Sequence, residues 1–264
     1  MSRIVMAFPS TRRVYLDNIG LADIDPAVYV RSVVFRAAQI STQTVARARW
    51  HGSHVTRQRV DGGSVQVTFS IREYGPAAYR DILRRVTAWA MGGGVLTTDD
   101  RPNQRLRVVC VSAPSGEGGM ADECSMEFAA YDNPFWEDIT PTTLILSGSS
   151  GSGQLFGPGS AADPFVEADV KPSGGTLTSL TLSAGGTQMA FSGLSVPQGK
   201  TFSLYYDKNM VLHAVRTDTG AALLGKRSAA SADDLMIPRG VFSEAAFTAN
   251  TAASVTFRTR GLYL

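Results

Sequence analysis

One short stretch constrains the fold more than any other, because a strand-like alternation in it is followed directly by a helical stripe. Residues 64–72 alternate polar side chains with the apolar Val65, Val67, Phe69 and Ile71. A period of two places these four side chains on one face of a β-sheet. The chain must therefore contain a sheet with one face to bury against a second layer.

The segment that supplies this layer follows within ten residues. Apolar side chains recur there at helical spacing, at Tyr79, Ile82, Leu83, Val86 and Trp89. Pro76 suits the first turn of a helix, and the three glycines at 92–94 suit its end. The spacing predicts one helix whose stripe packs on the 65–71 sheet face, with Trp89 in the core.

The rest of the chain reads as strands. Strand patterns at 28–35, 106–111 and 124–128 complete the first half. After 132–136 the composition shifts toward Ser, Thr and Gly, and short strands are expected at 165–170, 177–182, 188–191, 201–206, 211–216 and 254–262. Such a series with Gly and Pro between its members is typical of a β-sandwich. Residues 147–160 (SGSSGSGQLFGPGS) read as a long flexible loop or a strand connection.

We therefore predict a mainly β chain of two domains. Residues 1–137 form an N-terminal β-sheet domain packed by one α-helix, and residues 138–264 form a β-sandwich domain. With 264 residues, of which 44% are hydrophobic, the chain is long enough for two such cores.

Charge is unevenly distributed along the chain. Residues 1–60 carry six more basic than acidic side chains, residues 61–137 carry four more acidic than basic ones, and residues 138–264 are balanced. A basic edge of one subunit could meet an acidic edge of the next. The candidate interface residues are Arg47, Arg49, Arg57, Arg59, Asp99 and Asp100. The arginines are dispersed and not clustered with aromatic residues, so nucleic-acid binding is the less favoured interpretation.

No arrangement of residues makes a convincing catalytic or metal site. His51 and His54 form an HxxH pair, but a metal site needs further ligands. The acidic pair at 233–234, like the one at 99–100, is expected to face water in a turn. Cys110 and Cys124 lie in apolar strand-like runs and read as reduced, buried thiols, while the sequence leaves open whether they are close. We expect no catalytic residue, no cofactor and no metal.

Two further features bear on partners. Tyr205 and Tyr206 are candidate glycan contacts, because a flat aromatic ring suits the apolar side of a sugar, and the two point to opposite faces of their strand. No apolar run approaches the roughly 20 residues of a membrane helix, and the N-terminal residues lack the apolar region of a signal peptide. Membrane insertion is not expected.

The order of features in residues 47–136 resembles the distal tail protein family of long-tailed phages and prophages. The shared features are the alternating strand, a helix that ends near Trp89 and a glycine cluster, an Asp-rich turn at 98–102 and an aromatic-Pro-Phe hinge at 131–136. Here Asn133 is inserted in the hinge, where the family often has Asp-Pro-Phe. Residues 255–263 are similar to the closing strand of the family's second domain.

The resemblance implies a non-enzymatic structural virion protein of the tail tip. Its N-terminal domains would form a ring, as a hexamer, between the tail tube protein and the tail-associated hub protein. Its galectin-like second domain would offer an outer surface for receptor-binding proteins or host glycans. Assembly would take place in the bacterial host cytoplasm. The alternative is a carbohydrate-binding module on an adaptor domain that mediates host-surface attachment.

Overall fold

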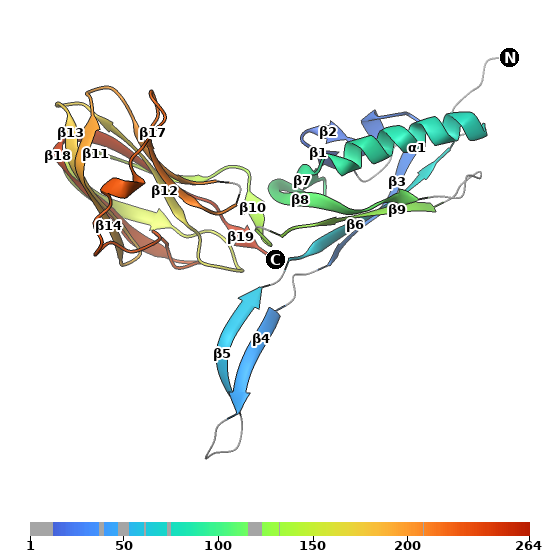
Figure 1. Cartoon of the computed structure of the whole chain (residues 1–264), viewed down its shortest axis with the longest axis horizontal. Coiled ribbons are helices and arrows are strands. Elements are labelled where there is room, and N and C mark those ends of the chain that lie inside the picture. The colour runs from blue at the N-terminus through green and yellow to red at the C-terminus, as the bar shows by residue number, and fades with distance from the viewer. Residues whose placement is uncertain are drawn as a thin grey trace. The chain divides into compact units, whose positions relative to one another are not determined.

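The computed structural model describes residues 13–36, 40–46, 53–60, 62–72, 75–115, 123–131, 133–207 and 209–264. It divides into two compact units (Figure 1). The N-terminal unit comprises Met1–Trp136 together with Leu264, and the C-terminal unit comprises Glu137–Tyr263. The prediction of a mainly β chain, with a helix-packed sheet followed by a β-sandwich, is confirmed.

The N-terminal unit contains one sheet in the order β2-β1-β7-β8-β9-β6-β3, with a separate β4–β5 pair. Its strands are β1 (Val14–Leu16), β2 (Ile19–Gly20), β3 (Val28–Arg36), β4 (Ile40–Ala46), β5 (Ser53–Val60), β6 (Ser64–Ile71), β7 (Gly94–Thr98), β8 (Arg101–Ser115) and β9 (Glu123–Ala129). Helix α1 (Pro76–Met91) and the short 3-10 helix η1 (Leu21–Asp23) complete the unit. Strand β10 (Trp136–Asp138) spans the boundary, since Trp136 belongs to the N-terminal unit and the next two residues belong to the C-terminal unit.

The alternating apolar residues of β6 form one side of the N-terminal core, as predicted. Val65, Val67, Phe69 and Ile71 are all buried, and so are Cys124, Met126 and Phe128 of the neighbouring β9. Figure 1 shows α1 lying over this sheet. From α1, Tyr79, Ile82, Val86 and Ala90 are buried. The Tyr79 hydroxyl lies 3.2 Å from the Cys124 Sγ, which links the helix directly to β9.

Trp89 does not lie in the core as the helical spacing predicted. Its side chain is only partly buried, and its indole N–H donates to the carbonyl of Ile19 at 3.1 Å. One ring edge meets Phe128 at a centroid distance of 6.1 Å. The neighbouring Ala90 is buried instead.

The helix ends where the glycines predicted it would. Gly93 has φ +59°, in the left-handed region that favours glycine, and its N–H donates to Ala90 O. A Cβ at Gly93 would lie 2.9 Å from the carbonyl oxygen of Val108. The glycine therefore allows α1 to stop and the chain to enter β7 directly.

The C-terminal unit is built from one sheet in the order β14-β13-β18-β12-β15-β16-β17, with β11 paired to β18. Its elements are β11 (Thr142–Phe156), β12 (Val166–Pro172), β13 (Leu177–Ala184), β14 (Thr187–Val196), β15 (Phe202–Tyr206), β16 (Leu212–Arg216), β17 (Ala221–Ala222), η2 (Leu224–Lys226), β18 (Phe242–Thr259) and β19 (Leu262–Tyr263).

This sheet folds over to form a sandwich. The first half of β18 pairs with β13 through Ala245–Ala249, and its second half pairs with β12 through Ala253–Thr259. One long strand thus belongs to both layers, as strands do at the corners of sandwiches. Phe191 of β14 and Phe202 of β15 lie far apart in the sheet order, yet their rings meet at 5.1 Å in the buried core.

The prediction of a loop or strand connection at 147–160 is wrong for most of the segment. Residues up to Phe156 belong to β11, which pairs with β18 along its whole length. Its register shifts between Gly148 and Ser150, where the strand bends. A Cβ at Gly153 would lie 3.1 Å from Leu144 Cδ1, and one at Gly151 would lie 3.2 Å from Phe247 Cε1. The glycines are therefore a packing requirement on the inner side of a bent strand.

This packing predicts an asymmetry between neighbouring positions of β11. Gly153→Val should destabilise the chain by about 1–3 kcal/mol, because the branched side chain would overpack against Leu144 and Leu146. Ser152→Val is the matched control, since Ser152 is exposed, and should change stability by less than about 0.5 kcal/mol. Urea denaturation of both variants measures the difference. Equal stabilities would contradict the assignment of an inner face to Gly153.

Candidate functional site

The basic candidate residues belong to the hairpin β4–β5 or to the segment that joins its strands. Arg57 and Arg59 lie on β5, paired in register with Gln43 and Ser41 of β4. Arg47 and Arg49 lie outside the described residues. The two strands form a sheet of their own. An isolated two-stranded hairpin is at best marginally stable in water.

The acidic candidates occupy the tight turn between β7 and β8. Asp99 and Asp100 are both exposed, as predicted for a solvated turn. The backbone N–H of Asp99 donates to the carbonyl of Arg13 at 3.2 Å. The pKa of Arg13 is raised, first by a hydrogen bond with Tyr15 and further by the charges of Tyr15 and Asp99. The turn therefore presents negative charge beside one arginine of its own unit.

A feature that the sequence did not reveal lies at the start of β8. The guanidinium of Arg101 lies over the rings of Trp136 and Phe35, at 4.9 and 5.2 Å from their centroids. The same group donates to Gln104 Oε1 and to the carbonyl of Leu264, both at 3.2 Å. A pocket of about 110 Å³ lies here, lined by Arg101, Phe35, Trp136 and Leu264 together with Arg36, Gly63, Ser64, Val65, Leu106 and Pro134. Arg101 thereby fixes the hinge aromatic Trp136 and Leu264 within the N-terminal unit.

Tyr205 and Tyr206 lie in different environments, as their alternation predicted. Tyr205 is partly exposed, and its ring stacks on His213 of β16 with centroids 5.3 Å apart and planes inclined by 17°. Tyr206 packs against Phe165 at 4.5 Å and donates its hydroxyl to Asp234 Oδ1 at 3.0 Å. Burial raises the pKa of Tyr206 above its usual value, and the Asp234 charge adds to this effect. The Tyr206 hydroxyl is thus used within the fold, whereas the Tyr205 ring keeps an accessible part.

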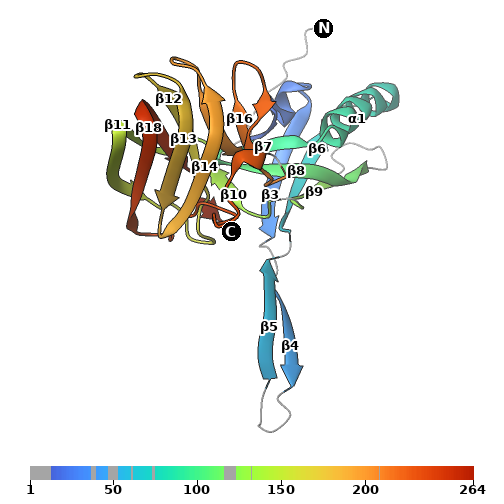
Figure 2. The same ribbon diagram turned by 60° about the vertical axis from the view of Figure 1, so that its left-hand side comes forward.

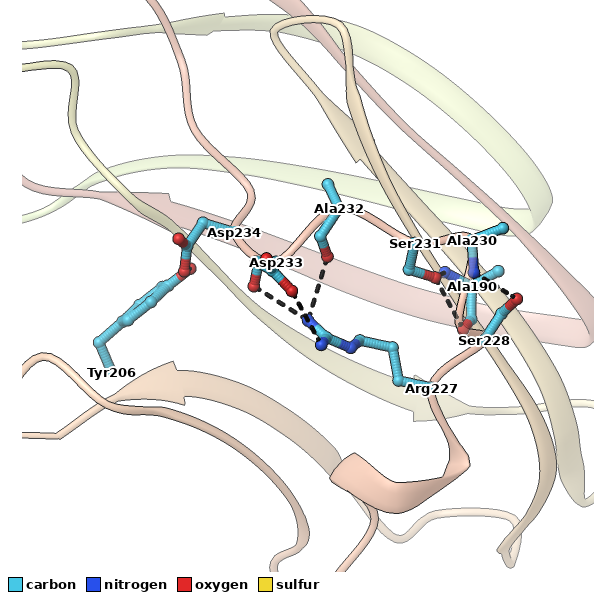
Figure 3. A network of polar contacts seen from close by, with 9 residues as sticks. All are labelled: Ala190, Tyr206, Arg227, Ser228, Ala230, Ser231, Ala232, Asp233 and Asp234. Carbon is cyan, nitrogen blue, oxygen red and sulfur yellow. Dashed lines mark hydrogen bonds and ion pairs between the residues drawn. The ribbon is translucent and has the colours of Figure 1, made fainter. Parts of the chain in front are cut away.

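The neighbouring carboxylates of Asp233 and Asp234 contact different residues (Figure 3). Asp234 accepts from Tyr206, whereas Asp233 pairs with Arg227 at 3.1 Å. Arg227 also donates to the carbonyls of Ala232 and Asp233. The Asp234 contact ties the segment after η2 to β15, whereas the Asp233 side chain is 92% exposed and its ion pair contributes little stability.

His213 belongs to a further cluster of polar contacts. Its Nε2 lies 3.2 Å from Asp207 Oδ2, and the other Asp207 oxygen accepts from the backbone N–H of Val211 and of Asn209. The pKa of Asp207 is lowered, first by the Val211 hydrogen bond and then by those of His213 and Asn209. This turn between β15 and β16 holds His213 against Tyr205.

Across the part of the chain that the structure describes, no group of three or more His, Cys, Asp or Glu side chains is placed to hold a metal ion. His51 lies outside that part, and His54 is on β5. Cys110 and Cys124 are not joined by a disulfide; Cys124 is buried as predicted, whereas Cys110 is only partly buried. No helix among the described residues is long and apolar enough to span a membrane.

Comparison with known proteins identifies the fold. No protein-family model matches the chain, and no curated protein matches its sequence. Its structure is similar to that of SPP1 Dit (gp 19.1), titled a paradigm of the hub adsorption apparatus in phages that infect Gram-positive bacteria. The TM-score is 0.73 at 12% identity, over 95% of this chain and 99% of that one. It is also similar to a chain of the phage P2 baseplate in its activated conformation, with a TM-score of 0.50 at 8% identity, over 95% and 98% of the two chains.

The resemblance to distal tail proteins is therefore confirmed in the fold, which covers both units. A sequence identity of 12% over this length explains why the resemblance rests on the order of features and on no single motif.

The Tyr206 contact generates a stability prediction. Tyr206→Phe removes the donor to Asp234 and leaves a partly buried carboxylate without it, which should cost about 1–3 kcal/mol in unfolding free energy. Tyr205→Phe is the matched control on the adjacent residue and should cost less than about 0.5 kcal/mol. Thermal and urea unfolding of both variants measure the costs. An unaffected Tyr206→Phe variant would contradict the structural role.

The Asp207 turn generates a pH prediction. A lowered pKa means that the folded chain binds the proton less readily than the unfolded chain, so the contribution of Asp207 is present at neutral pH and lost only as pH falls through the lowered value. The carboxyl-carbon NMR signal of Asp207 should therefore titrate below the usual aspartate midpoint of about 3.9. Asp207→Asn should speed exchange of the Val211 amide at neutral pH. A normal midpoint would show that the turn is open.

Proposed function

We propose that the chain is a structural virion protein of a long-tailed phage or prophage tail tip. The observation that carries this proposal is the fold shared with SPP1 Dit across 95% of the chain, including both units and their order. A match confined to the sandwich would support only a generic β domain, since sandwiches serve many functions. Here the match extends over 95% of the chain, so it includes residues of both the helix-packed sheet and the sandwich.

The proposed mechanism is assembly without bond chemistry. Residues 1–137 act as the ring-forming domain, and the ring is a hexamer. Residues 138–264 act as a galectin-like domain on the outside. The ring joins the tail tube protein to the tail-associated hub protein, and the outer domain offers attachment to receptor-binding proteins. The chain is assembled in the bacterial cytoplasm and resides in the virion.

Two features of the N-terminal unit support a ring. A ring requires two different complementary surfaces on each subunit, because each copy contacts the next head to tail. The hairpin β4–β5 carries basic residues and needs a partner for stability, and the β7–β8 turn presents Asp99 and Asp100. The proposed contact places Arg57 and Arg59 of one copy against this turn of the next.

The first test is the mass of the purified full chain, measured by light scattering and native mass spectrometry, with negative-stain micrographs. We expect a closed assembly with a central opening, which also binds the tail tube protein and the hub protein encoded with it. A chain that stays monomeric at high concentration, alone and with both companions, would overturn the proposal.

A charge-reversal series tests the contact itself. Arg57→Glu with Arg59→Glu should weaken the ring contact by about tenfold or more, because like charges then face each other. Adding Asp99→Arg and Asp100→Arg in the same chain should restore it, since the two charges have exchanged places. The acidic-turn substitutions alone should weaken it as the first pair does. A combined variant as weak as either parent would place the contact elsewhere.

A second candidate function rests on the Tyr205–His213 stack. The stack gives a flat aromatic surface that is partly exposed, and such a surface suits a sugar ring. As a carbohydrate-binding module the chain would mediate host-surface attachment. A glycan array would then show saturable binding that is lost in Tyr205→Ala and kept in Tyr206→Phe. Absence of binding by the wild-type chain would exclude this candidate.

A further inference from the structure

The longest exposed sheet edge of the C-terminal unit belongs to β11. One side of this strand pairs with β18, and among the described residues no strand pairs with its other side. Figure 2 shows β11 at the outer margin of the sheet. An edge of 15 residues leaves a long row of backbone N–H and C=O groups available to another strand.

This edge has almost none of the features that prevent edge pairing in soluble proteins. Natural edges carry charged residues or proline, or are short or covered. Residues 142–156 contain no charged residue and no proline, and the one irregularity is the bulge between Gly148 and Ser150. The opposite end of the sheet is different, because β14 is covered by hydrogen bonds from Ser228 and Ala232.

The burial pattern leaves apolar surface beside β11 that a further strand could cover. Its inner-face residues Leu144 and Leu146 pack against the core but are only partly buried. The inner residues Val255 and Phe257, opposite them on β18, are fully buried. A strand added beyond β11 would cover the two leucines and complete the core at this margin.

The sequence of the edge is complementary to itself. Residues 147–152 read Ser-Gly-Ser-Ser-Gly-Ser, which is the same in both directions. An antiparallel contact between two identical strands obeys a two-fold rule, in which residue i of one copy faces residue j of the other and j faces i. With the axis between Ser149 and Ser150, Ser147 meets Ser152 and Gly148 meets Gly151.

The bulge makes this register consistent with the two faces of the sheet. Before the bulge, the exposed positions of β11 are odd-numbered, and after it they are even-numbered. Outer Ser147 therefore meets outer Ser152, and outer Ile145, which is 66% exposed, meets outer Gln154. On the inner side, Leu144 meets Leu155. Directly opposed residues of an antiparallel pair must lie on the same face, and every pair here meets that condition.

We propose that β11 is a homotypic docking edge, which pairs with the β11 strand of a second copy of this chain about a two-fold axis. The absence of charge favours a second copy over an unlike partner, because any charged residue near such an axis would face its own like charge. This inference goes beyond the proposed ring, which uses the N-terminal unit and unlike surfaces.

The test uses the full chain and two double variants at the same positions. Ser147→Asp with Ser152→Asp places like charges opposite each other twice, and should raise the dissociation constant of the two-fold contact by about tenfold or more. Ser147→Asp with Ser152→Lys places opposite charges there and should keep the contact. In native mass spectrometry, the first variant should have half the mass of the wild-type assembly, and the second should have the full mass.

Hydrogen exchange gives an independent measurement on the unmodified chain. Amides of residues 142–156 should gain protection as the wild-type concentration rises. Unchanged thermal melting of both variants at low concentration would show that the fold is intact. The proposal is overturned if both variants keep the wild-type mass, if both lose it equally, or if protection of these amides does not depend on concentration. A lost ring with an intact two-fold dimer would instead count against the proposed function alone.

Discussion

The architecture of the C-terminal unit depends on a single strand, β18, that pairs with β11, β12 and β13 and bends between its two halves. On the inner side of this strand pair a small residue stands opposite a large one, since Gly151 of β11 pairs with the buried Phe247 of β18. Ala245 and Ala253 of β18 are buried, and Gly151 and Gly153 stand on β11. The aromatic residues Phe191, Phe202 and Phe257 fill the wider part of the core.

The N-terminal unit buries its apolar side chains in a different way. One face of its sheet is covered by α1, and the other carries polar side chains that bond to one another. Ser64 donates to Glu127 at 2.6 Å, and Arg36 donates to Gln66 at 3.0 Å and lies 3.5 Å from Glu127. Exposed pairs of this kind contribute little stability. Each unit therefore buries a core of its own.

The parts of the fold that were predictable are those with a visible hydrophobic period. The alternation in β6 and β9 and the stripe in α1 show their buried faces directly. β11 was missed because its inner face is made partly of glycine, so the alternation disappears into a Ser/Gly pattern that is also typical of loops. Trp89 was misplaced because spacing gives the side of the helix but not the room available at each turn.

The candidate site residues also include features that local sequence predicts and features that it does not. That Tyr205 and Tyr206 face opposite ways follows from strand geometry alone. Which of them is anchored depends on Phe165 and Asp234, which are remote in sequence. The stack of Arg101 on Phe35 and Trp136 joins three segments that are distant in sequence, so no local sequence pattern predicts it.

The two proposed contacts between copies differ in chemistry as well as in symmetry, and this difference makes them compatible. The ring contact joins unlike, charged surfaces and forms a head-to-tail interface, whereas the β11 contact joins like with like through backbone hydrogen bonds and uncharged side chains. Exposed charges are screened within about 10 Å at 0.1 M salt, while burial of apolar side chains is not weakened by salt. Rising ionic strength should therefore open the ring while leaving the two-fold contact in place. The proposed ring contact thus uses the half of the chain with uneven charge, residues 1–137, and the proposed β11 contact uses the half with balanced charge, residues 138–264.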